Sequence, residues 1–198
     1  MKSVAMSGSR RANVGKKDAK ALRVQSLVPC VLYGGSEQIA FSATEAEFKP
    51  LVYTPDVHTV ELTIDGVAHK AVLKDLQLHP VTDRILHADF LEVGDGKAVT
   101  MSLPIKFAGN SAGVKAGGKL TKKMRKLKVR GPIDKMPGEI TIDITNLDLG
   151  QSIRAGEVAL DGLTLLDAPT LTVVTIKTTR NVAAAAPADD KKAAKGKK

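Results

Sequence analysis

The residues of this chain whose types and spacing could do chemistry are mainly cations, and three of them are spaced for one face of a helix. Lys16, Lys20 and Arg23 follow one another at i, i+4 and i+7, which is a narrow arc of a helix. Arg10 and Arg11 lie in the loop before it. Such a row can meet one groove of a polyanion, or it can be an ordinary solvated face. From the residues alone, both interpretations stay open.

A second set of cations is spaced for a strand. Lys126, Lys128 and Arg130 alternate with Leu127 and Val129, so the cations share one face and the apolar residues point inward. The strand rise places successive cations roughly 6 to 7 Å apart.

One motif has the spacing of a nucleotide-binding P-loop. Gly113 is followed at the right distance by Gly118 and Lys119. Leu120, however, stands where Ser or Thr would hold magnesium, and no parallel strand-loop-helix pattern surrounds the motif. We therefore do not predict nucleotide binding from it.

The remaining polar residues give little support for catalysis or metal binding. The spacing of His79, His87 and Asp89 matches no zinc or iron signature, so we interpret them as polar anchors or RNA contacts. Cys30 is the only cysteine, and we expect it to be buried and unreactive. No nucleophile or carboxylate pair lies in a recognisable motif. The sequence predicts no enzyme, no cofactor and no metal.

The charges of the chain are sorted into blocks. Lysines and arginines outnumber acids by seven to one in residues 1–35 and by eleven to one in 96–136. Acids dominate 36–95 and 137–180, and the net charge is +9. Two concentrated basic stretches indicate contact with a polyanion at defined places, and nucleic acid is the first candidate.

Composition narrows the class of protein. Hydrophobic residues make up 43% of the 198, which is enough for a folded core, but aromatic residues make up only 3%. Stacking of unpaired bases is therefore disfavoured against contact with phosphates and helix shape. No signal peptide or apolar stretch of about 20 residues is present, so we expect a soluble, cytoplasmic protein.

The helix that carries the cationic row is predicted from about Lys17 to Leu27. We expect it to end before Pro29, because the residue before a proline disfavours helical torsions. Its apolar residues are spread around the wheel, so we expect it to depend on a partner for order. A buried strand from Cys30 to Tyr33 follows.

Most of the rest of the first half is predicted to be strand. Thr44 and Glu47 have the spacing of a capping box and predict a short helix. Strands are predicted over 59–64 and 67–78, joined by a type I′ turn at Asp65-Gly66, and over 84–93. The glycine-rich residues 94–96 indicate a domain boundary.

The second half is also predicted to be rich in strands. Period-two patterning predicts them at 99–107, 126–130, 139–147 and 171–177, with few helices. The last residues, 181–198, have the composition of a flexible basic tail.

Taken in order, several short stretches resemble one protein family. They match the bacterial large-subunit ribosomal proteins that bind 5S rRNA, the ribosomal protein L twenty-five family, in the longer two-domain form called general stress protein CTC. The resemblance covers nearly the whole chain except the tail. It rests on Gly15-Lys16, Leu22-Arg23, Pro29 to Gly35, Gln77 to Thr82, Ile85 to Phe90, Gly113 to Gly118, Val129 to Pro132 and Asp143 to Leu147.

The resemblance implies a fold and a set of contacts. It implies a small β-barrel with two short helices in a 5S rRNA-binding domain at 1–94, a β-rich domain at 97–180 and the tail at 181–198. The basic block from Lys115 to Arg130 is left with three alternatives: contact with 23S rRNA, contact with a neighbouring large-subunit protein, or a solvated surface. The RNA contacts carried over by position are Arg10, Arg11, Lys16, Lys20, Arg23, Tyr33, His87 and Asp89.

The function predicted from all of this is that of a structural constituent of the large ribosomal subunit, without contact with a membrane. Several family members have consecutive arginines on the helix where this chain has Lys20-Ala21. Two alternatives remain, a general polyanion or DNA-binding protein and a nucleotide-binding enzyme. Lys16 and Arg23 are both expected to be exposed, so that reversing their charges would leave the fold intact.

Overall fold

The computed structural model describes residues 1–94 and 96–179, so the tail predicted at 181–198 lies outside the described residues. The chain forms two compact units, each built from segments that are separate in sequence. The domain boundary near residues 94–97 stays a prediction. The first unit consists of Met1–Pro104, Lys126–Ile140 and Leu160–Asp167, and the second of Ile105–Arg125, Thr141–Ala159 and the residues from Ala168 onward.

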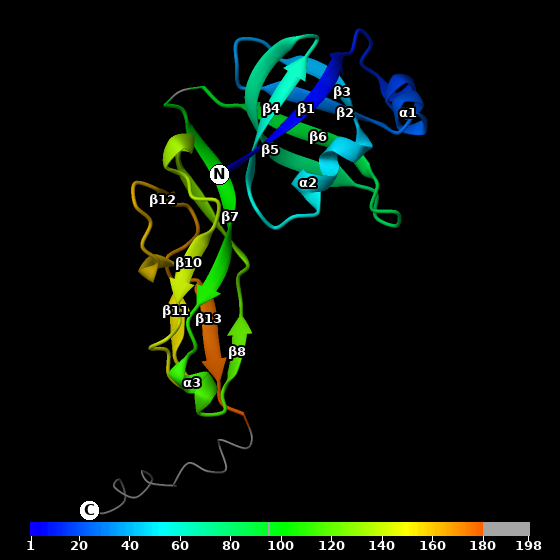
Figure 1. Cartoon of the computed structure of the whole chain (residues 1–198). Helices are drawn as coiled ribbons and strands as arrows, with labels where there is room; N and C mark the ends of the chain where they lie inside the picture. Colours follow the sequence, from blue (N-terminus) through cyan, green and yellow to red (C-terminus); the bar gives the residue numbers. More distant parts are fainter. Residues whose placement is uncertain (95, 180–198) are drawn as a thin grey trace, which may run out of the picture. The chain divides into compact units, whose positions relative to one another are not determined.

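Six strands of the first unit form a closed barrel in the order β1-β3-β2-β6-β5-β4, which confirms the predicted barrel (Figure 1). β1 and β4 close it by pairing in parallel, and β2 and β6 are also parallel. Asp65 and Gly66 have positive φ angles of 47° and 87°, as the predicted type I′ turn between β4 and β5 requires. The strands are β1 (Lys2–Arg10), β2 (Leu27–Tyr33), β3 (Ile39–Thr44), β4 (His58–Ile64), β5 (Val67–Leu78) and β6 (Ile85–Glu92).

Alternate residues of these strands fill the barrel. Leu32, Leu62 and Phe90 are fully buried, whereas their neighbours along the chain are at least partly exposed. The ring of Phe90 lies 5.7 Å from that of Phe41 and 6.1 Å from that of Phe48, measured between centroids. Because side chains alternate between the two faces of a strand, the same packing fixes which residues of β2 and β6 point outward.

The first helix is shorter than predicted. α1 spans Lys16–Val24 instead of 17–27, and the chain turns at Ser26, whose φ is 60°. Pro29 does not end the helix; it lies buried within β2, opposite Ser42 of β3. The turn at Ser26 therefore separates helix from strand.

The predicted capping box does not form. A 3₁₀ helix (Glu45–Phe48) continues into α2 (Lys49–Val52), and the side chain of Thr44 makes no capping hydrogen bond. Glu47 instead accepts a 2.7 Å hydrogen bond from the hydroxyl of Ser7 on β1. A contact between a strand and a 3₁₀ helix that are distant in sequence has replaced the local one.

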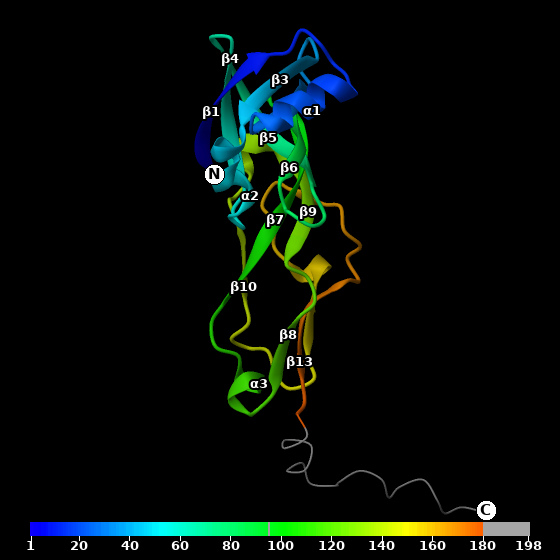
Figure 2. The same cartoon turned by 90° about the vertical axis from the view of Figure 1, so that its right-hand side faces the viewer.

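Four strands of the second half form another sheet in the order β10-β7-β9-β12, in which β9 is antiparallel to β7 and to β12. Figure 2 shows β7 and β9 side by side. The strand predicted at 139–147 ends early, because Asp143 accepts the backbone N–H of Thr145 and turns the chain. The alternation is confirmed, since Ile140, Ile142 and Ile144 are all buried. The strands are β7 (Ala98–Ala108), β9 (Lys126–Pro132), β10 (Ile140–Asp143) and β12 (Thr164–Leu165).

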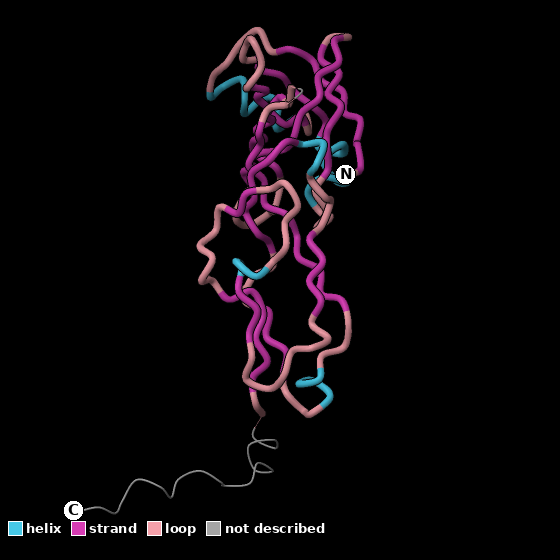
Figure 3. Tube along the Cα trace, turned by 90° about the vertical axis from the view of Figure 1, so that its left-hand side faces the viewer, coloured by secondary structure: helices cyan, strands magenta, loops and turns pink. Residues whose placement is uncertain are grey.

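A three-stranded sheet in the second unit has the order β11-β13-β8. Val174 and Ile176 of β13 are fully buried in its core. Strands dominate the described residues and helices are short, which confirms the predicted mainly β fold class (Figure 3). The remaining elements are α3 (Ala112–Lys115), β8 (Lys119–Lys122), β11 (Ser152–Arg154), β13 (Thr172–Lys177) and 3₁₀ turns at Ile133–Lys135 and Ala155–Glu157.

Candidate nucleic-acid interface

Two arginines hold α1 on the barrel. No residue of α1 is fully buried, and of its apolar residues only Ala19 and Leu22 are partly buried. In its first turn, Asp18 pairs with Arg11 at 2.6 Å, and Arg11 also donates to the carbonyl of Asn13. In its last turn, the Arg23 guanidinium donates to the carbonyl of Leu86 through Nε at 3.0 Å and Nη2 at 2.8 Å. The helix is thus fastened at both ends by side chains.

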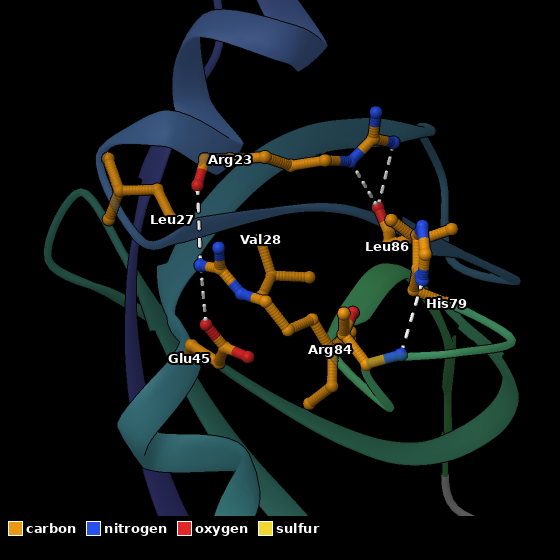
Figure 4. A pocket seen from close by; sticks show the side chains of 9 residues that line it. Arg23, Leu27, Val28, Glu45, His79, Arg84 and Leu86 are labelled. Carbon is orange, nitrogen blue, oxygen red and sulfur yellow. Dashed lines mark hydrogen bonds and ion pairs between the residues drawn. The ribbon is translucent and has the colours of Figure 1, made fainter.

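Arg23 is therefore not the exposed residue that was predicted. It is half-buried, and it lines a surface pocket of about 270 Å³ in which Arg84 donates both to the Arg23 carbonyl and to Glu45 (Figure 4). A guanidinium has five N–H groups, and the Leu86 carbonyl receives two of them. One guanidinium nitrogen points away from Leu86 (Figure 4). Arg23 can consequently anchor the helix and still donate to a phosphate.

The other cations of this region are exposed. Arg10 at the end of β1 and Lys16 and Lys20 on α1 have exposed side chains, and no ion pair of the described residues includes them. Arg11 differs from Arg10, because its side chain is only 9% exposed and is held by Asp18. Of the two adjacent arginines, Arg10 is the one with a side chain available to a ligand.

Tyr33, His87 and Asp89 lie together on the outside of the barrel. β2 and β6 are paired neighbours, and the three side chains alternate with the buried Leu32, Ala88 and Phe90. The Nδ1 atom of His87 lies 2.8 Å from the Asp89 carboxylate. Because a carboxylate only accepts hydrogen bonds, Nδ1 carries the hydrogen and Nε2 is left for a ligand.

The surroundings of Tyr33 disfavour its phenolate form. Burial raises the pKa of Tyr33 above its usual value, and the negative charges of Asp89 and Asp75 raise it further. A tyrosine is protonated at neutral pH even with its usual pKa of about 10, so the hydroxyl can donate a hydrogen bond there.

The structure thus divides the predicted residues into two groups. Tyr33, His87 and Asp89 share one outer face, and the carbonyl that holds Arg23 belongs to Leu86, next to His87. Arg10, Arg11, Lys16 and Lys20 belong to β1, α1 and the loop between them.

Two polar residues beside this face were missed by the sequence reasoning. Asp75 and Gln77 on β5 are exposed and lie opposite Asp89 and His87 of β6. The pairing of β5 with β6 would have pointed to them, but an irregularity between Leu73 and Asp75 shifts the register.

The chain is similar to known proteins over almost its whole length. It is 45% identical to the large ribosomal subunit protein bL25 of Porphyromonas gingivalis over 188 residues, which cover 94% of this chain and 98% of that protein. It is 42% identical to the protein of the same name from Bacteroides fragilis over 196 residues, covering 96% and 100%. Residues 6–90 match the model of the Ribosomal L25p family. The chain belongs to this family.

The match extends beyond the barrel. Residues 98–180 match the C-terminal domain of ribosomal protein TL5, which confirms the longer form that the sequence predicted. The L25p family consists of structural ribosomal proteins, so this chain is not an enzyme.

The loop that resembles a P-loop packs closely against the segment that contains Asp148 and Leu149. Every backbone N–H from Ala112 to Gly118 already donates to an acceptor of the protein, so none is left to cradle phosphate. A Cβ atom on Gly113 would lie 2.7 Å from the backbone of Asp148, and one on Gly118 would lie 2.5 Å from the side chain of Leu149. The glycines of this L25p member permit close approach of two chain segments.

Other sites considered from the sequence also find no support among the described residues. Cys30 is fully buried as predicted, and burial raises the pKa of its thiol, which makes it unreactive. Histidine, cysteine and acidic side chains form no cluster suited to a metal ion within 1–94 and 96–179. In the same residues, no helix is long and apolar enough to cross a membrane.

Proposed function

We propose that this chain is a structural constituent of the large ribosomal subunit and that it binds 5S rRNA through its barrel domain, residues 1–94. The contacts are the eight predicted residues, with Arg10, Lys16 and Lys20 as the main phosphate ligands. Arg11 and Arg23 act chiefly by holding α1 in place. The protein is then found on the ribosome. Its C-terminal domain, residues 97–180, follows the barrel domain in the sequence.

The observation that carries this proposal is the set of cations on β1 and α1 that have no partner in the described protein. Arg10, Lys16 and Lys20 are exposed, whereas the arginines between and after them are engaged with Asp18 and Leu86. Duplex RNA exposes phosphates and 2′-hydroxyls but hides its base edges in a deep groove, so a fixed array of donors can recognise its shape. Tyr33 supplies a neutral donor, and Nε2 of His87, which Asp89 leaves free, can bond to a hydroxyl or a base edge.

The test is a titration of 5S rRNA with the full chain at several salt concentrations. If about six phosphates are neutralised, the affinity should fall by roughly a thousandfold or more between about 50 and 200 mM salt. Affinity that stays constant over this range would contradict phosphate-dominated binding.

A general polyanion-binding function is the second candidate. It is favoured by the exposed lysines, which as point charges recognise phosphate without the planar geometry of arginine. Competition separates the two functions: duplex DNA should displace little 5S rRNA if shape is recognised, and should displace it at comparable concentration if only charge matters.

A further inference from the structure

The outward face of β9 is a regular row of cations. Lys126, Lys128 and Arg130 are all exposed, while Leu127 and Val129 between them are fully buried. The strand rise spaces the cations about 6.7 Å apart on one face. No ion pair of the described residues includes any of the three.

The paired positions on neighbouring strands add hydroxyls to this face. Arg130 lies between Thr100 of β7 and Thr164 of β12, and Lys128 lies opposite Ser102 of β7. Residues directly opposite each other in an antiparallel pair project to the same side of the sheet. Asp167 accepts the backbone N–H of Lys128 at 2.7 Å, and Asp56 and Asp75 line one groove with Lys126 and Lys128 without an ion pair to either lysine in the described part of the chain.

This combination indicates a ligand and its class. Three like charges in a row repel one another, and a row of anions with similar spacing would remove that repulsion. Hydroxyls beside cations are common donors to phosphate oxygens. The paired positions carry no aromatic side chain, although protein interfaces are enriched in aromatics and depleted in lysine, so RNA is favoured over a protein partner.

We propose that the β9 face, Lys126, Lys128 and Arg130 with their flanking hydroxyls, binds the phosphate backbone of an RNA duplex other than the one bound by the barrel. The chain then joins two RNA segments. The inference extends the proposed function, but it uses different residues and can fail separately.

The experiment starts from the complex of the full chain with 5S rRNA, in which the barrel site is occupied. A labelled RNA duplex of about 20 base pairs, longer than the roughly 16 that a double-stranded RNA module spans, is titrated into it between about 50 and 200 mM salt. The triple variant Lys126→Gln, Lys128→Gln, Arg130→Gln is compared with the unchanged chain. We expect the affinity for the second duplex to fall at least about tenfold and the salt slope to decrease by about 2 to 3, with the affinity for 5S rRNA unchanged.

A matched control removes three exposed lysines of the second unit: Lys119→Gln, Lys123→Gln, Lys177→Gln. An equal loss in this control would show a general charge effect and overturn the proposal. So would a second duplex that binds the triple variant normally, or a lowered melting temperature of that variant, which would mean that the cations stabilise the chain itself. If the unchanged chain does not bind 5S rRNA, the proposed function is wrong. The β9 face is then tested by titrating the RNA duplex into the free chain.

Discussion

The two cationic regions of this protein are positioned by different forces. On β9, buried leucine and valine side chains alternate with the cations, so the core itself orients Lys126, Lys128 and Arg130. On α1 no residue is fully buried, and the helix is held by Arg11 and Arg23. On β9, the apolar residues stabilise the strand and the cations do not. On α1, two of the charged side chains, Arg11 and Arg23, themselves hold the helix in place.

This difference shows that charge alone does not tell which cations have side chains free to bind a ligand. A guanidinium in a basic segment can donate its hydrogen bonds to a carboxylate or a carbonyl of its own protein, as those of Arg11 and Arg23 do. A lysine on the exposed face of a strand is not needed to hold that strand when buried apolar residues already do so. Variants that separate charge from packing should therefore behave differently in the two regions.

The largest effect is expected for the packing of β9. Leu127→Ala removes a fully buried side chain and should lower the free energy of unfolding by about 2 to 5 kcal/mol. Lys128→Ala, one residue away on the exposed face, should change it by less than about 0.5 kcal/mol. Urea unfolding of both variants makes the comparison, and similar losses would show that the two faces are not independent.

The exposed lysines of α1 should matter for RNA and not for folding. Lys16→Ala with Lys20→Ala removes two charge-assisted contacts of the proposed site, each worth at least about 1.4 kcal/mol, so 5S rRNA affinity should fall on the order of a hundredfold. The melting temperature should not change, because neither side chain has a partner in the described protein. Unchanged RNA affinity would remove both lysines from the site.

Arg23 should show a mixed effect. Arg23→Ala breaks both hydrogen bonds to the Leu86 carbonyl and should cost about 1 to 2 kcal/mol of stability. Arg23→Lys keeps the charge but loses the forked geometry, so it should restore only part of that stability. Urea unfolding of the two variants measures this, and a full rescue by lysine would mean that charge, not geometry, anchors the helix.

Much of the fold followed from local sequence patterns. Alternation predicted β9, and Asp65-Gly66 predicted the turn between β4 and β5, because each signal is contained in a few consecutive residues. The capping box failed because Glu47 bonds to Ser7, forty residues away in the chain. Pro29 was misread because a partner strand, β3, decides whether a proline can lie in β2.

The candidate site could be predicted less completely from the sequence, for the same reason. The spacing of Lys16 and Lys20 indicated their shared face, but nothing local shows that Arg23 reaches Leu86, which follows sixty-three residues later. The neighbours of His87 and Asp89 on β5 required the strand register, which an irregularity shifts. What depends on contacts between distant segments has to be read from the structure.

The smallest predicted effect concerns the outer face of β2 and β6. Burial and the charges of Asp89 and Asp75 raise the pKa of Tyr33, so the folded state disfavours the phenolate. Its contribution to stability is fully present below the unfolded value of about 10 and is lost as pH rises through the higher folded pKa. In a Tyr53→Phe background, where Tyr33 is the only tyrosine, ultraviolet titration should give a midpoint above 10.

Asp89→Asn tests the electrostatic part of this shift. The substitution removes one negative charge but leaves the burial, so the midpoint of Tyr33 should fall only part of the way toward its usual value. Glu61→Gln, which removes an exposed charge from β4, serves as the control and should leave the midpoint unchanged. An equal fall in both variants would mean that the net charge of the barrel, and not the closeness of Asp89, determines the pKa of Tyr33. The outer face of β2 and β6 would then lack a local electrostatic coupling between Tyr33 and Asp89.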